Sequence, residues 1–123
     1  MAKIVHFEIP VDDSERAVAF YHDVLGWAVS RYGEAPYWLV RAGEDEEPGA
    51  NGALVSREDL HQAPVLIAGV ADIDDVLSLA QKSGGQIIQG KLPIPGMGWS
   101  AYVRDPEGNT IGFFQQDANA TAS

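Results

Sequence analysis

Hydrophobic and polar residues alternate at the start of the chain with the two-residue period of a β-strand. Between Lys3 and Ile9 every second side chain points to the same side, so His6 and Glu8 share one face while apolar residues occupy the other. This pattern predicts a first strand with an unusually polar face.

Helical spacing follows directly after this strand. Asp13 can cap a helix N-terminus with its carboxylate, and apolar residues then recur three and four positions apart until Gly26 ends the run. Phe20 and Tyr21 fall on the apolar stripe of this helix, so we expect them to anchor it on a sheet. His22 falls off the stripe and is expected to face solvent.

The segment after the first helix predicts three further strands and a surface loop. The strand candidates are residues 27–32, 37–41 and 52–56, bounded by segments rich in glycine, proline and polar residues. Residues 43–51 are mostly acidic side chains, glycine and proline, which a core does not bury, so we expect an exposed loop there.

The same order of elements then begins again. An apolar strand candidate at residues 65–70 precedes Asp72, which can cap a second helix, and Gly84 ends that helix. Three more strand candidates follow, at residues 86–91, 99–104 and 110–115.

A weak internal repeat relates the two halves of the chain. Superimposing His6 on Val65 also places Gly26 on Gly85, and the helix caps and apolar positions between them correspond in order. Each half consists of a strand, a helix and three strands, which is too little to bury a sheet alone. Two copies are therefore expected to complete one core by pairing.

We accordingly expect a single α+β domain built from two tandem βαβββ modules. Module one covers about residues 3–57 and module two about residues 64–116. The polar tail at residues 117–123 is expected to be disordered.

Composition narrows the class of protein. A chain of 123 residues that is 46% hydrophobic can build a core without disulfides, and the absence of cysteine excludes thiolate metal sites and cysteine nucleophiles. A net charge of −10 repels nucleic-acid phosphates and anionic membrane surfaces. There is no secretory signal pattern and no apolar run of about 20 residues. We expect a cytoplasmic protein with no nucleic-acid or membrane partner.

Two segments carry a family resemblance. They are VHFEIPVDDSERAVAFYHDVLGW at residues 5–27 and GWSAYVRDPEGNTIGFFQ at residues 98–115. Together they resemble the vicinal oxygen chelate superfamily, which includes glyoxalase I, extradiol dioxygenases and bleomycin resistance proteins. The resemblance implies a curved, mostly antiparallel sheet, a small-molecule ligand and a homodimer.

In the catalytic members of that superfamily, metal ligands come from the first and last strands of each module. The resemblance places His6 at the first of these positions, but it places Val65, the segment 52–55 and Gly112 at the other three. These residues offer no donor side chain, so we expect the metal site to be lost and no cofactor to be needed. Glu8, on the same strand face as His6, leaves a weak two-ligand divalent metal site open as an alternative.

His6 and Glu8 are the candidate catalytic pair. One interpretation is a half-buried histidine that bonds to Glu8 or to the backbone; the other is a metal-free general base whose pKa Glu8 raises. His61 lies in the polar linker between the modules and is expected to be exposed, although the resemblance implies that such linkers can pass near the mouth of a pocket.

The candidate ligand-binding side chains combine this pair with aromatic and rim residues. About half of the aromatic residues on the strands are expected to face the helices instead of the ligand. Gly112 is expected either to open space at the floor of a pocket or to mark a bulge or a close strand contact. The full set is His6, Glu8, Tyr37, Trp38, Met97, Trp99, Tyr102 and Gly112.

Three functions remain open from the sequence. The first is a small-molecule-binding protein of glyoxalase-like fold without the usual metal. The second is a metal-dependent lyase, isomerase or dioxygenase that uses His6 and Glu8, and the third is a dimeric module that binds a protein partner.

Overall fold

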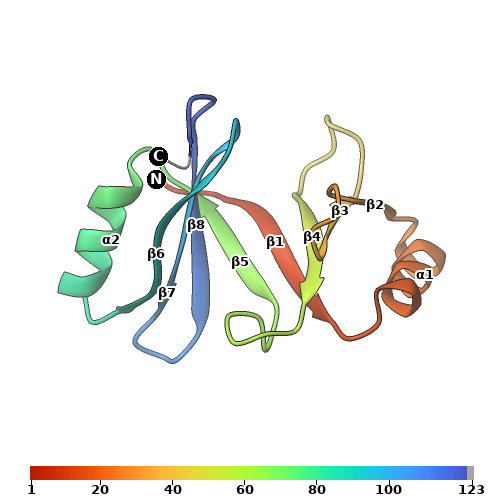
Figure 1. Cartoon of the computed structure of the whole chain (residues 1–123), viewed down its shortest axis with the longest axis horizontal. Helices are drawn as coiled ribbons and strands as arrows, with labels where there is room; N and C mark the ends of the chain where they lie inside the picture. Colours follow the sequence, from red (N-terminus) through yellow and green to blue (C-terminus); the bar gives the residue numbers. More distant parts are fainter. Residues whose placement is uncertain (122–123) are drawn as a thin grey trace. The chain divides into compact units, whose positions relative to one another are not determined.

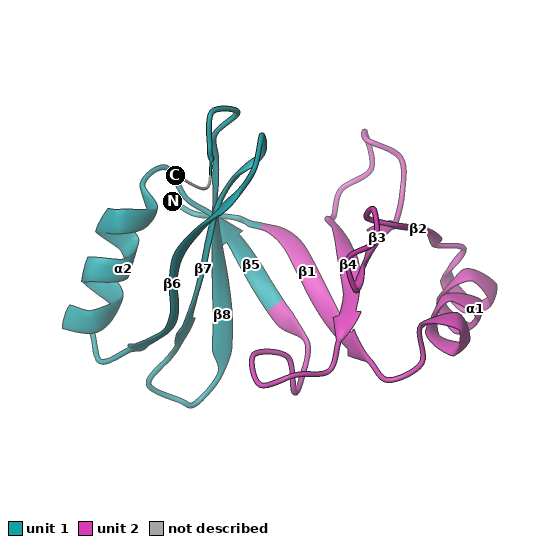
Figure 2. Ribbon diagram, viewed as in Figure 1, with its two compact units in different colours: residues 1–4, 66–123 teal, residues 5–65 magenta. Residues whose placement is uncertain are grey.

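The computed structural model describes residues 1–121 and divides the chain into two compact units. The N-terminal unit comprises Val5–Val65, and the C-terminal unit comprises Met1–Ile4 together with the chain from Leu66 onward (Figure 2). The organisation of the two units as a single domain is a prediction from the sequence.

The N-terminal unit holds four strands and one helix (Figure 1). The strands are ordered β2-β3-β4-β1, with β1 parallel to β4 and the other neighbours antiparallel. Its elements are β1 (Ile4–Val11), α1 (Ser14–Leu25), β2 (Ala28–Arg31), β3 (Tyr37–Arg41) and β4 (Asn51–Ser56).

The C-terminal unit repeats this arrangement. Its strands are ordered β5-β8-β7-β6, with β5 parallel to β8 and the other neighbours antiparallel. The predicted α+β class, with two βαβββ repeats and mostly antiparallel pairing, is therefore confirmed. The elements are β5 (Val65–Gly69), α2 (Ile73–Lys82), β6 (Gln86–Ile94), β7 (Gly98–Arg104) and β8 (Thr110–Gln116).

The helices begin at the aspartates that were predicted to cap them, and α1 ends at the predicted glycine. The Asp13 carboxylate accepts a hydrogen bond from the backbone N–H of Arg16, and Gly26 adopts the left-handed conformation that closes α1 at φ 72°. The Asp72 carboxylate caps α2 in the same way. Neither helix, nor any other in residues 1–121, is long and apolar enough to cross a membrane.

Only the second helix packs as expected. Ile73 and Leu77 of α2 are buried against Ala101 and Val103 of β7 and form the core of the C-terminal unit. By contrast, α1 has no buried residue, and Phe20 is 57% exposed. The expectation that Phe20 anchors its helix on the sheet is therefore wrong.

The first helix is held instead by an aromatic contact near its C-terminal end. Tyr21 stacks on Trp27, just beyond the helix, with ring centroids 4.9 Å apart. A groove of about 500 Å³ separates α1 from the indole of Trp38 on β3. On α1 the groove is lined by Ser14, Glu15, Val18, Ala19, His22 and Asp23, and not by Phe20 or Tyr21. His22 is exposed, as predicted.

The expected disorder of the tail is wrong for its first residues. The backbone N–H of Asp117 donates to the Met97 carbonyl at 2.9 Å, and the Asp117 carboxylate accepts from the Trp99 indole at 3.0 Å. Ala120 is fully buried. These bonds hold the segment to the hairpin of β6 and β7, while residues 122–123 lie outside the described part of the chain.

Candidate functional site

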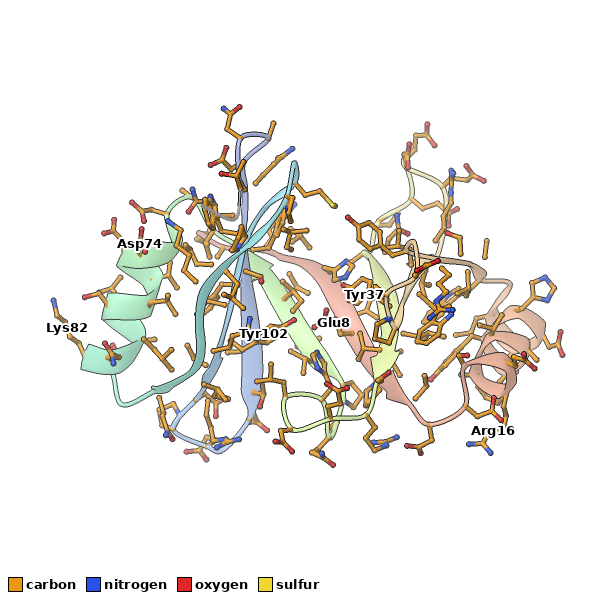
Figure 3. All side chains as sticks on the ribbon, viewed as in Figure 1. Glu8, Arg16, Tyr37, Asp74, Lys82 and Tyr102 are labelled. Carbon is orange, nitrogen blue, oxygen red and sulfur yellow. The ribbon has the colours of Figure 1, made fainter. Side chains whose placement is uncertain are left out.

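A group of four polar side chains lies on one face of the N-terminal unit. We call it the polar cluster: His6 and Glu8 of β1, Tyr37 of β3 and His61 of the linker after β4. Figure 3 shows Glu8 and Tyr37 on their separate strands. The whole cluster lies between Val5 and Val65, within a single unit.

Strand order explains how Tyr37 reaches Glu8. The strand β4 lies between β3 and β1, so Tyr37 and Glu8 are separated by two inter-strand spacings, about 10 Å, across the sheet. They are also offset by two residues along it, because Tyr37 pairs with Val55 and Glu8 pairs with Ala53. Ala53 of β4 pairs with Glu8 and is fully buried, yet it carries only a methyl group. This small side chain leaves room above β4 for the long tyrosine to meet the carboxylate.

The cluster is a continuous series of short hydrogen bonds. The Tyr37 hydroxyl donates to Oε2 of Glu8 at 2.9 Å, and it lies 2.7 Å from Nε2 of His6. On the other side, Nε2 of His61 lies 2.7 Å from Oε1 of Glu8. Glu8 is only 4% exposed, so both oxygens of a buried carboxylate are satisfied by protein groups.

Burial controls the ionisation of the groups around Glu8. Desolvation lowers the pKa of His6, and the nearby charge of Glu8 opposes this without overcoming it. Glu8 does raise the pKa of His6, as expected, but burial has the larger effect and the pKa of His6 is lowered overall. Burial, the Glu8 charge and the hydrogen bond to Glu8 all raise the pKa of Tyr37, so its hydroxyl stays protonated.

His61 is the residue that sequence reasoning missed. It was expected to be exposed in the linker, but its side chain is only 13% exposed and contacts Glu8. The linker turns back because the His61 N–H donates to the Glu58 carbonyl, and Arg57 bonds to Asp12 at the far end of β1. The one available signal was Glu8 itself, since a carboxylate on an inward strand face requires partners from elsewhere.

Trp38 does not share the face of Tyr37. Adjacent residues of a strand point to opposite sides, and Trp38 lies against the groove beside α1. Its ring carries the guanidinium of Arg31 at 5.4 Å from the centroid. Within the N-terminal unit, the predicted pocket residues are thus split between the two faces of β3.

In the C-terminal unit, Trp99 belongs to the helix side. It packs against the α2 core, and Lys91 lies 4.6 Å from the centroid of its ring. Met97 sits in the turn between β6 and β7 and is 46% exposed. Tyr102, in contrast, is buried and is the register partner of Gly112.

The space at Gly112 is filled. A Cβ atom built there would collide with Cδ1 of Ile67 and would come within 3.0 Å of the Tyr102 ring. The expectation of open space at this position is therefore wrong, and the alternative of close strand contact describes the residue instead. Gly112 is required because Ile67 and Tyr102 occupy the volume in which a side chain would stand.

Three of the four superfamily metal-ligand positions have no donor side chain in this chain, and only His6 is of a ligating type. Val65 and Gly112 have no donor side chain, Ala53 offers a methyl group, and both oxygens of Glu8 already accept hydrogen bonds. Within residues 1–121, no three histidine, aspartate or glutamate side chains are grouped so as to hold a metal ion. The donor set of this chain therefore differs from that of the catalytic members.

Two βαβββ repeats and a polar first strand define a glyoxalase-like protein. Residues 3–36 match the family model of the bleomycin resistance protein-like N-terminal domain. The chain is also 34% identical over 124 aligned residues to a lactoylglutathione lyase of Haemophilus influenzae, with 92% of each sequence covered. The chain belongs to the glyoxalase/bleomycin resistance/dioxygenase superfamily.

Solved structures agree on the fold. A superfamily member from Vibrio splendidus has a TM-score of 0.69 at 19% identity and covers 95% of this chain and 100% of that one. A methylmalonyl-CoA epimerase in complex with methylmalonyl-CoA and NH4+ also has a TM-score of 0.69, at 17% identity, with 99% of each chain covered. At these identities the likeness concerns the fold alone.

Proposed function

We propose that this protein binds a small molecule at the polar cluster and does so without the divalent metal of its catalytic relatives. The observation that carries the proposal is the hydrogen-bonded series from His6 through Tyr37 and Glu8 to His61. A fold gains little stability from a buried charge of this kind, whereas perturbed ionisable groups gathered together are typical of binding and catalytic sites.

The relatives support a small-molecule ligand over a macromolecular one. The names of two of them refer to lactoylglutathione and methylmalonyl-CoA, which are both small metabolites. The net charge of −10 opposes binding to nucleic acid. A cytoplasmic location and a homodimer are part of the same proposal.

A metal-dependent lyase is the second candidate. It is favoured by the 34% identity to a lactoylglutathione lyase and by the retention of His6 at the first ligand position. In this alternative His6 and Glu8 would be released from Tyr37 and His61 to hold the ion. The two candidates make opposite predictions about bound metal.

Metal analysis of the purified, untagged protein distinguishes them. We expect no stoichiometric metal, and no rise in melting temperature with Zn, Ni, Mn, Fe or Co salts. Stoichiometric metal that is lost in His6→Ala and kept in His22→Ala would establish the second candidate. His22 is the matched control because it is an exposed histidine of the same unit.

Ligand screening then tests binding itself. A library of metabolites is screened by thermal shift in the presence of a chelator, and hits are repeated on Tyr37→Phe. We expect hits whose stabilising effect is lost in the variant. Hits that respond equally in both proteins would place binding outside the polar cluster and contradict the proposal.

A further inference from the structure

The polar cluster fixes the position of each of its protons. A tyrosine hydroxyl has a single hydrogen, and Tyr37 donates it to the carboxylate of Glu8. An ionised carboxylate only accepts hydrogen bonds, so it has no proton to return to Tyr37. The short contact between the Tyr37 oxygen and Nε2 of His6 must therefore take its hydrogen from the histidine.

This requirement selects one tautomer of His6. A neutral imidazole carries one N–H, and in His6 it is placed on Nε2, which leaves the lone pair on Nδ1. The same argument holds for His61, whose Nε2 faces the other carboxylate oxygen of Glu8. One buried carboxylate thus orients two imidazoles, one directly and one through a tyrosine.

Nδ1 of His6 is accessible to a ligand. The only side-chain hydrogen bond of His6 in the described part of the chain is the one at Nε2. In the same part of the chain, among residues that are not exposed, every fully buried side-chain nitrogen or oxygen has a hydrogen-bond partner. Since His6 is only partly exposed and Nδ1 has no such partner, this nitrogen must reach the surface.

We infer that Nδ1 of His6 is the acceptor at which the ligand docks, so that the ligand presents an O–H or N–H group and is neutral or cationic. This inference rests on the proposed function and specifies its ligand. The negative charge of Glu8, two hydrogen bonds away, and the net charge of −10 disfavour an anionic group at the same place. An acceptor-only ligand would find no donor on this nitrogen.

Nitrogen-15 NMR of histidine-labelled protein tests the tautomer without any ligand. At about pH 8, where an ordinary imidazole is neutral, we expect His6 to show a protonated Nε2 and an unprotonated Nδ1. In Tyr37→Phe the preference should relax toward a mixture, while His61 keeps its tautomer because its own contact with Glu8 remains. A wild-type His6 protonated on Nδ1 overturns the inference.

Three simple probes test the ligand class. Phenol has a donor, anisole has the same ring without one, and benzoate carries a negative charge. We expect phenol to shift the Nδ1 resonance of His6 at millimolar concentration, anisole to leave it unchanged and benzoate to bind more weakly than phenol. The resonance of exposed His22 serves as the internal control.

The outcomes separate the two proposals. Equal shifts with phenol and anisole overturn the inference about donors but leave binding at the cluster intact. No response to any probe or library compound, with the Nε2–H tautomer present, counts against the proposed function itself and removes the ligand class with it.

Discussion

Tyr37 converts two neighbouring side chains of one strand into a connected site. His6 and Glu8 share a face of β1 but are joined through the tyrosine hydroxyl. This oxygen lies 2.7 Å from Nε2 of His6 and 2.9 Å from Oε2 of Glu8. Because the linkage is indirect, Glu8 influences His6 chiefly through its charge, and burial dominates the ionisation of the histidine.

The lowered pKa of His6 predicts how stability depends on pH. The folded state binds a proton at His6 less readily than the unfolded chain, whose histidine titrates near 6.5. Stability contributed by neutral His6 is therefore complete above this pH and is lost as the pH falls from about 6.5 through the folded-state value. We expect the free energy of unfolding, measured with urea, to decrease over this interval.

His6→Gln should reduce that pH dependence, and His22→Gln should not. The groups that face His6 are Tyr37 from β3 and Glu8 from its own strand, with His61 beyond them. One proton accounts for a slope of at most about 1.4 kcal/mol per pH unit. An unchanged slope in His6→Gln would show that another group is responsible.

Gly112 offers a second residue-level prediction. Gly112→Ala should lower the free energy of unfolding by about 1–3 kcal/mol, because the added methyl group must displace buried Ile67 and the Tyr102 ring. Gly90→Ala, on β6 of the same unit, has no heavy atom within 4 Å of the new Cβ. That control should be neutral or slightly stabilising, and equal losses in both variants would refute the steric explanation.

The site was only partly predictable from the sequence. Alternation placed His6 and Glu8 on one face, and this holds because the period of a strand is a local property. Tyr37, which joined them, was one of several equivalent aromatic candidates. His61 was missed because its position depends on how the linker turns back, which is a tertiary property that no spacing rule encodes.

At the scale of elements, the two helices behave differently despite similar patterns. Both have an aspartate cap and an apolar stripe. In α2 the side chains of Ile73 and Leu77 are buried, whereas α1 has no buried residue. The helix caps and most strand positions could be predicted because they depend on neighbouring residues, although β1 and β6 run two and three residues beyond their predicted ends, at residues 9 and 91. Helix packing could not, since it depends on whether the sheet offers a complementary surface.

This difference is measurable with matched leucines. Leu77→Ala should reduce the free energy of unfolding by about 2–5 kcal/mol, because it leaves a cavity beneath α2. Leu25→Ala, at the end of α1, removes a side chain that is 52% exposed and should cost less than about 1 kcal/mol. Urea denaturation of both variants provides the comparison.

A large loss in Leu25→Ala would mean that α1 is covered by something in solution. Its apolar residues Phe20, Val24 and Leu25 are all more than half exposed. Sedimentation of the same variant would then show whether the cover is a second copy of the chain.

At the scale of the whole molecule, the net negative charge should control how strongly two copies of the chain associate. With a net charge of −10, two copies repel one another, and salt screens this repulsion over a Debye length of about 8 Å at physiological ionic strength. We therefore expect the predicted homodimer to tighten as salt increases. Sedimentation equilibrium at low and high salt measures this.

A monomer at every salt concentration would rule out the homodimer. A dimer that weakens with salt would contradict the role assigned to the net charge and would indicate complementary charges at the interface. Both results leave the polar cluster unaffected, because all four of its side chains come from residues 5–65 of one chain.

The filled space at Gly112 also constrains how this lineage can change. A carboxylate side chain at this position would need Ile67 to move or to be smaller, because Cδ1 of Ile67 occupies the place of its first carbon atom. A change from glycine to glutamate alone is therefore expected to cost stability, and less so when position 67 carries a smaller side chain.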